Sequence, residues 1–231
     1  MREIVMDTET TGLDPNDGHR VVEIGAVELI NHIPTGRTYQ EYINPERDMP
    51  AEAEKIHGIS EAFLADKPVF SAIAEGFLAF LEADGQGEPS PGTLVIHNAA
   101  FDMKFLNSEL ARLGYDPIAD NRVIDSLMLA RQRFPGAPAN LDALCRRFDV
   151  DTSARTKHGA LLDSELLAEV YLGLIGGRQP GFDLAVGARD KKTAVTRERV
   201  ARPPRPHAPT AAELEAHQAF LEQIKDPLWH R

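Results

Sequence analysis

Four acidic side chains occupy positions where the surrounding pattern requires apolar residues. Asp7 and Glu9 are two residues apart after an apolar run, so a continuing strand would project both carboxylates from the face that carries Val5. Asp102 and Asp163 each share a helical stripe with apolar residues at offsets of three, four or seven positions. We therefore expect four carboxylates on buried faces of one fold.

These four carboxylates need compensation, because an unpaired charge in a low-dielectric interior is strongly destabilising. No set of arginine or lysine residues occupies matching core positions. An all-oxygen cluster suits hard Mg²⁺ or Mn²⁺ rather than zinc or copper. Two such ions about 3.5–4 Å apart would stabilise the attacking and the leaving oxygen of a phosphodiester displacement. For any single acid, a helix cap or a solvated position is the alternative interpretation.

His158 precedes Asp163 by five residues, an offset of roughly 140° on an α-helix, so the two cannot share a helical face. We place His158 in the loop before that helix, where it overhangs the carboxylates. An imidazole with an unperturbed pKa near ~6.5 can take a proton from water at neutral pH. An ordinary surface histidine is the alternative, and the link to the four acids favours the catalytic interpretation.

The elements that must position these residues are strands followed by helices. Short β-branched or alternating runs predict strands at 4–6, 21–30, 37–43 and 93–96. Helical spacing predicts helices at 69–81, 101–113, 126–134, 140–148 and 160–175. Three adjacent strands, then strands alternating with helices, indicate an α/β domain with a mixed central sheet flanked by helices.

The composition of the 231-residue chain is typical of a soluble globular protein, with 42% hydrophobic and 26% charged residues. No apolar run approaches the ~18 residues that a membrane span needs, and the start of the chain shows no secretory leader. The single cysteine, Cys145, excludes an internal disulfide and a thiolate zinc site. We expect a cytoplasmic protein with no membrane partner.

The net charge of −11 disfavours a nucleic-acid partner at first sight, but the charge is unevenly distributed. Residues 187–209 carry seven Arg or Lys against two acidic residues, together with four prolines, which is typical of a solvated linker. After it, Thr210 and Glu213 form a capping-box signature for a helix, and a tail that folds back on the domain is the alternative. We predict a domain at 1–177, a basic, flexible linker at 178–209 and a C-terminal helical segment at 210–231.

Three segments resemble the motifs of the DEDDh family of 3′→5′ exonucleases. They are DTETTGL at 7–13, VIHNAAFD at 95–102 and HGALLD at 158–163, whose His-x₄-Asp spacing separates this branch from relatives that carry tyrosine. The resemblance covers residues 1–177 and is strongest to the proofreading subunits of bacterial replicative DNA polymerases. It implies a ribonuclease H-like fold, hydrolysis with two divalent ions, Mg²⁺ or Mn²⁺, and release of 5′-mononucleotides.

The resemblance also implies a role for each matching residue. The metal ligands would be Asp7, Glu9, Asp102 and Asp163, with His158 as the general base. The terminal nucleotide would be bound by Thr8, Thr10, Leu13, His57, Asn98 and Phe101. Single-stranded or frayed 3′ ends of DNA would be favoured, because a base must be splayed from the duplex before its phosphate reaches buried metals.

Two segments after the domain resemble partner-binding elements. Residues 179–184 are similar to short sliding-clamp-binding peptides, and a plain linker is the alternative. The candidate clamp-binding residues are Gln179, Phe182 and Leu184. The terminal segment is similar to the element by which replicative family members bind the polymerase subunit, through Leu214, Leu221 and Trp229 in this chain. Such tethering would raise the effective concentration of the nuclease at the primer end.

Two other functions fit part of the sequence. A free-standing DEDDh nuclease that acts on RNA 3′ ends or short oligoribonucleotides would need no basic linker and no helical tail. A catalytically silent subunit that only bridges polymerase and clamp would have no reason to hold four core-facing acids. We therefore predict a proofreading 3′→5′ exonuclease.

Overall fold

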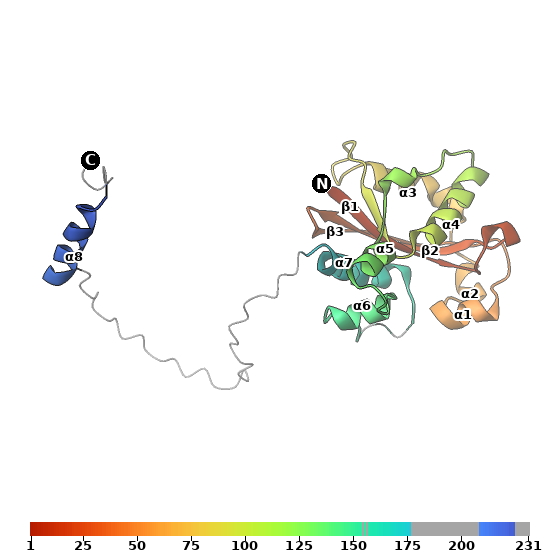
Figure 1. Cartoon of the computed structure of the whole chain (residues 1–231). Helices are drawn as coiled ribbons and strands as arrows, with labels where there is room; N and C mark the ends of the chain where they lie inside the picture. Colours follow the sequence, from red (N-terminus) through yellow and green to blue (C-terminus); the bar gives the residue numbers. More distant parts are fainter. Residues whose placement is uncertain (154, 156, 177–207, 225–231) are drawn as a thin grey trace, which may run out of the picture. The chain divides into compact units, whose positions relative to one another are not determined.

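The computed structural model describes residues 1–153, 155, 157–176 and 208–224 (Figure 1). The chain divides into two compact units, and the described residues of the first end at 176, whereas those of the second span 208–224. All but the last two residues of the predicted linker lie outside the described residues. So do four candidate partner-binding residues, Gln179, Phe182, Leu184 and Trp229.

A five-stranded sheet forms the centre of the first unit, in the order β3-β2-β1-β4-β5. Its strands are β1 (Arg2–Thr10), β2 (Val21–Ile30), β3 (Ile33–Tyr42), β4 (Thr93–Ile96) and β5 (Val123–Asp125). β1 pairs antiparallel with β2 and parallel with β4, so the predicted mixed sheet is confirmed. The parallel strands need crossover connections, and helices supply them.

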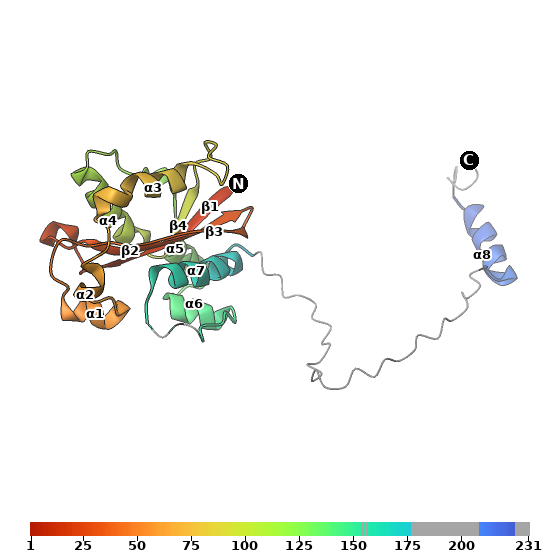
Figure 2. The same cartoon turned by 180° about the vertical axis from the view of Figure 1, so that it is seen from behind.

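Helices cover both faces of this sheet (Figures 1 and 2). One face carries α3 (Phe70–Glu82) and α4 (Ala99–Arg112), and the other carries α7 (Ala160–Leu174), against which α6 (Leu141–Arg147) packs. The same unit also contains α1 (Ala51–His57), α2 (Glu61–Leu64), α5 (Ser126–Arg133) and 3-10 turns at Pro15–Asp17 and Asp120–Arg122. Among the described residues, no helix combines the length and the apolar character that crossing a membrane requires.

Alternate residues of β1 enter two different cores. Ile4 and Met6 pack with residues of α3 and α4, whereas Val5 packs with residues of α7. This period of two is that of a strand buried on both faces. Asp7 and Glu9 continue the Val5 series, so the strand directs both carboxylates toward the α7 side of the sheet, where it ends.

The predicted strands and the five predicted helices of the first unit are all present. Three short elements, β5, α1 and α2, were not predicted. β5 and α2 have three and four residues, too few to show a period, and the seven residues of α1 (AEAEKIH) include only three apolar ones. β1 extends beyond both of its predicted ends and β3 begins four residues earlier than predicted, because pairing with β2 extends the ladder.

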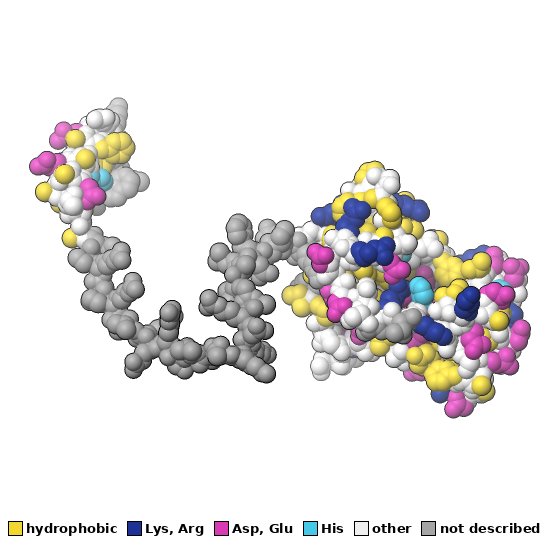
Figure 3. All heavy atoms as spheres, turned by 90° about the horizontal axis from the view of Figure 1, so that it is seen from below, with side chains coloured by type: hydrophobic (Ala, Val, Ile, Leu, Met, Phe, Trp, Pro, Cys, Tyr) yellow, Lys and Arg dark blue, Asp and Glu magenta, His cyan; other side chains and the backbone are white. Residues whose placement is uncertain are grey.

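The described part of the second unit is a single helix, α8 (Ala211–Leu221). The predicted capping box is confirmed: Thr210 accepts from the Glu213 backbone, and the Glu213 carboxylate accepts from the Thr210 backbone. The helix ends at Leu221, within the predicted helical segment 210–231. Leu221 is buried, whereas Leu214 and Phe220 are 52% and 58% exposed, and apolar side chains are visible on the surface of α8 in Figure 3.

Candidate active site

β1 brings the first two predicted carboxylates to the end of the sheet. Asp7 is half-buried, and Glu9 is buried opposite Glu23 of β2, immediately before the register of the ladder shifts. The Glu23 carboxylate is buried too and accepts a hydrogen bond of 3.1 Å from the backbone of Ala160 at the start of α7. Glu23 was missed from the sequence, because its strand carries two acids, Glu23 and Glu28, and the pattern does not distinguish between them.

Asp102 lies in the first turn of α4 and is 3% exposed. The backbone N–H and the hydroxyl of Thr8 both donate to its Oδ1, at 3.1 and 2.7 Å, so Thr8 ties α4 to β1. The turn into α4 holds Asn98 at a φ of 65°, a left-handed conformation that asparagine tolerates better than most residues. Asp125 steadies this turn, because its Oδ1 accepts from the Asn98 backbone at 3.2 Å.

Asp163 lies in the first turn of α7 and is 4% exposed. α7 approaches β2 so closely that a Cβ at Gly25 would lie 2.1 Å from the backbone of Ala160 and Leu161. The hydroxyl of Ser164 donates to the Gly25 carbonyl at 2.9 Å across the same contact. Only glycine at position 25 allows α7 to bring Asp163 this close to β1 and β2.

Burial and mutual repulsion raise the pKa values of three of these acids. Burial first, and then the charge of Asp102, raises the pKa of Asp7 well above its ordinary range. Burial, followed by the charge of Asp163, raises the pKa of Glu9 to about 8. Burial raises the pKa of Asp102 to about 7, although the hydrogen bonds from Thr8 oppose the shift. A bound cation would favour the ionised forms, so this set of oxygen donors fits hard divalent metal ions.

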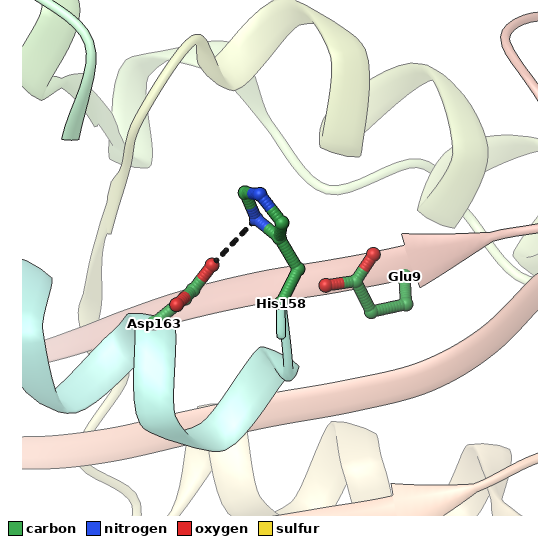
Figure 4. A group of neighbouring side chains, drawn as sticks. All are labelled: Glu9, His158 and Asp163. Carbon is green, nitrogen blue, oxygen red and sulfur yellow. Dashed lines mark hydrogen bonds and ion pairs between the residues drawn. The ribbon is translucent and has the colours of Figure 1, made fainter. Parts of the chain in front are cut away.

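Glu9, His158 and Asp163 form a cluster in which one potential ligand atom of each residue lies within 4.8 Å of the others (Figure 4). His158 is in the loop before α7, is half-exposed, and has its Nδ1 3.2 Å from Oδ2 of Asp163. Asp7 and Asp102 are outside this 4.8 Å group, but their charges act on it, since both acids repel Glu9 or are repelled by it. The four acids and the histidine therefore share one electrostatic site.

Arg155 is a cation that the residue pattern did not predict at this site. Its Nε and Nη2 donate to Oδ1 and Oδ2 of Asp163, each at 2.6 Å. Nη2 also lies 2.8 Å from Nδ1 of His158, and Nη1 contacts Asp142 of α6. No arginine or lysine was expected at a matching core position, and the cation that pairs with Asp163 comes from a loop instead. Arg155 comes from an aperiodic loop, so nothing in the sequence indicated where its side chain lies.

A cavity of about 550 Å³ adjoins the carboxylates, with Glu9 in its wall. Five of the six residues predicted to bind the terminal nucleotide line it: Thr8, Thr10, Leu13, His57 and Phe101. Asn98 is not part of the lining, and its observed place is in the turn before α4. Leu13 is 84% exposed, and burial lowers the pKa of His57, which favours a neutral ring.

His19 is a further cavity residue that the motifs did not indicate. Its ring packs on Gly12, where a Cβ would lie 2.4 Å from the imidazole carbon and Nδ1. Nδ1 also lies 3.1 Å from the hydroxyl of Thr11. The turn at Pro15–Asp17 brings this ring back over the first motif, a contact between residues that share no sequence period.

Comparison with known proteins finds relatives along almost the whole chain. A family model for exonucleases, RNase_T, matches residues 4–171. The DNA polymerase III subunit epsilon of Rickettsia felis is 50% identical over 230 residues, which cover 97% of each chain. The subunit of the same name from Escherichia coli is 40% identical over 235 residues, which cover 97% of this chain and 93% of that protein.

Solved structures share the fold of the first unit. Exonuclease X in complex with 5′ overhanging duplex DNA matches with a TM-score of 0.56 at 25% identity, over 77% of this chain and 92% of that one. The nuclease domain of 3′hExo, a DEDDh family member, matches with a TM-score of 0.64 at 18% identity and the same coverage. These matches confirm the predicted ribonuclease H-like fold.

Proposed function

The chain belongs to the exonuclease family, with epsilon subunits of DNA polymerase III as close relatives, and we propose that the four converging acids and His158 carry its activity. It is a 3′→5′ exonuclease. The observation that carries the residue assignment is the meeting of β1, α4 and α7: each contributes a carboxylate to one electrostatic site beside a cavity.

Exonucleases of this family use divalent metal ions, and we assign two such ions, Mg²⁺ or Mn²⁺, to this site. Their ligands would be Asp7, Glu9, Asp102 and Asp163. The raised pKa values support the assignment, because carboxylates that repel one another gain most from a cation. When bound, the ions would neutralise the phosphate and stabilise both oxygens of the displacement. The convergence of β1, α4 and α7, which carry these four carboxylates, supports the assignment.

His158 is the group we assign as general base. It approaches Asp163 from the loop before α7, and its ring is half-exposed, so water and substrate can reach it. An imidazole accepts a proton efficiently near neutral pH when one ring nitrogen has a free lone pair. The proton of the attacking water would pass to that nitrogen as the water oxygen bonds to phosphorus. The bond from phosphorus to the 3′ oxygen of the preceding nucleotide would break, and that oxygen would take up a proton from solvent.

The cavity next to Glu9 is our candidate site for the terminal nucleotide. Its volume is within the range of pockets that hold small ligands. Phe101 and the exposed Leu13 offer apolar surface for a base, whereas Thr10 and the backbone of the first motif offer polar groups for the sugar. None of these contacts reads base identity, so we expect removal of any of the four nucleotides from a single-stranded or frayed end.

A DNA polymerase subunit is the partner we propose, because the relatives are named as subunits of DNA polymerase III. The exposed Leu214 and Phe220 of α8 support a docking role for the segment 210–231. The candidate clamp-binding peptide at 179–184 lies outside the described residues and rests on its sequence alone. Lys and Arg side chains are scattered among acidic ones on the face shown in Figure 3, and the chain carries a net charge of −11. We therefore propose that the tether brings the first unit to DNA.

Hydrolysis of labelled oligonucleotides tests the proposed function. With a 5′-labelled single-stranded oligodeoxynucleotide and Mg²⁺, we expect products that shorten one nucleotide at a time from the 3′ end, with release of 5′-mononucleotides. An RNA oligonucleotide of the same sequence serves as the matched substrate. Internal cleavage would contradict the exonuclease mechanism, and faster degradation of RNA than of DNA would contradict the substrate assignment.

A further inference from the structure

We infer that Arg155 is a positioning residue that holds Asp163 and His158 together and that a metal ion must displace Arg155 in order to bind Asp163. The inference rests on the proposed metal site and adds a residue to it. The inference is based on the contacts of the Arg155 guanidinium. Each of its three nitrogens contacts Asp163 or Asp142, and Nη2 also contacts His158.

The contact between Arg155 and Asp163 is a bidentate ion pair. Nε and Nη2 each donate to a different carboxylate oxygen at 2.6 Å, and the arginine side chain is only 9% exposed. Charge-assisted pairs of this geometry are the strongest hydrogen bonds that side chains form. Both oxygens that Asp163 could offer to a metal ion are therefore already engaged by a cation of the chain itself.

Arg155 also contacts the imidazole of His158. Its Nη2 lies 2.8 Å from Nδ1, and the same Nδ1 lies 3.2 Å from Oδ2 of Asp163. The side chains of Arg155, Asp163 and His158 therefore contact one another, and Arg155 occupies the space beside both residues of the proposed site.

Binding of a divalent ion to Asp163 would break both contacts of Arg155, the one with Asp163 and the one with His158. The ion draws on the same two oxygens as Arg155, and its charge repels a guanidinium held a few ångströms away. Asp142 of α6, whose side chain is 54% exposed, already contacts Nη1 and offers the displaced arginine a partner. When Arg155 moves to Asp142, Asp163 becomes a metal ligand and Arg155 no longer contacts His158.

Calorimetric titration of the full-length protein with Mn²⁺, without DNA, tests the inference independently of activity. We expect Arg155→Gln to bind Mn²⁺ about tenfold more tightly than the wild type, equivalent to ~1.4 kcal/mol. Arg155→Lys should be intermediate, because it keeps the charge and loses the bidentate geometry. Arg146→Gln is the matched control, since it removes the same charge from an exposed position on α6 and should leave the affinity unchanged.

The role of Asp142 is tested by a double-mutant cycle. Asp142→Asn should weaken Mn²⁺ binding in the wild-type background, because Arg155 loses its second partner and stays on Asp163. The same change should have no effect in the Arg155→Gln background. Equal weakening in both backgrounds would show that Asp142 acts through its charge alone and would overturn this step.

The outcomes separate the inference from the function on which it rests. If the wild type binds no Mn²⁺, or if Asp163→Asn does not weaken binding, the metal assignment fails and the inference fails with it. If the wild type binds Mn²⁺ but Arg155→Gln binds equally or more weakly, only the Arg155 inference fails. Tightening by Arg146→Gln to the same extent would also overturn it. Circular dichroism establishes that each variant is folded, and Arg155→Lys decides the result should Arg155→Gln not fold.

Discussion

Thr8 is joined to Asp102 twice, through its backbone N–H and through its hydroxyl, and both groups donate to the same carboxylate oxygen. Thr8 lies between Asp7 and Glu9 in β1, whereas Asp102 lies in α4, 94 residues later in the sequence. The two hydrogen bonds therefore set the distance between the acids of the strand and the acid of the helix. Thr8, which the motif pattern predicts to bind the terminal nucleotide, therefore also positions the proposed metal ligands.

Loss of the Thr8 hydroxyl should lower activity more than stability. Thr8→Val keeps the shape and the backbone bond but removes one buried hydrogen bond to a charged group, and we expect kcat to fall about tenfold. Thr8→Ser keeps the hydroxyl and is the matched control. Steady-state hydrolysis of single-stranded DNA measures the effect, and equal kcat values for the two variants would contradict the positioning role of this bond.

The stability of the protein in EDTA should fall as the pH rises from 5 to 8. The pKa values of Glu9 and Asp102 are raised to about 8 and about 7, so the folded protein holds protons that the unfolded chain has released. This contribution to stability is complete below the unfolded values near ~4 and is lost as the pH passes through 7 to 8. Mg²⁺ should restore the melting temperature at pH 8.

Glu9→Gln provides the control for this pH dependence, since it removes one of the raised groups without changing the shape of the side chain. Melting temperatures of both proteins in EDTA, at intervals from pH 5 to pH 8, give the comparison. The variant should show a shallower fall than the wild type. A wild-type melting temperature that rises over this range, or identical slopes for the two proteins, would argue against the electrostatic description of the site.

The exposed apolar side chains of α8 should matter for partner binding and not for hydrolysis. In the full-length protein, Leu214→Glu combined with Phe220→Glu places charges on surface that we expect the polymerase subunit to cover. Gln218→Glu adds one charge at an exposed position of the same helix and is the control. Co-purification with the polymerase subunit should be lost only in the double variant. Retention there would exclude α8 as the docking element.

The sequence predicted the features of the fold that repeat over many residues. Periodic burial revealed the long strands and helices, and the position of Asp7 and Glu9 on the Val5 face followed from the period of two alone. The acids of α4 and α7 were visible for the same reason, as charges within apolar stripes. Short elements such as β5 and α1 lack that repetition and were missed.

Contacts between distant segments explain the other differences. Arg155 reaches Asp163 from a loop, Glu23 becomes part of the site through the β1–β2 register, and His19 returns over Gly12 after a short turn. The spacing of residues along the sequence indicates none of these contacts. Asn98 forms the left-handed turn before α4 and lies outside the cavity lining, and its predicted contact with the nucleotide stays a prediction.

The most direct test of the assigned site is hydrolysis by the Asp7→Ala/Glu9→Ala double variant. Asp116→Ala/Asp120→Ala removes the same two charges from exposed positions and is the control. With Mg²⁺ and single-stranded DNA, we predict that the first variant releases no 5′-mononucleotides above background while it still binds the polymerase subunit, and that the control behaves like the wild type. Nuclease activity retained by the folded Asp7→Ala/Glu9→Ala protein would contradict the assignment of the active site.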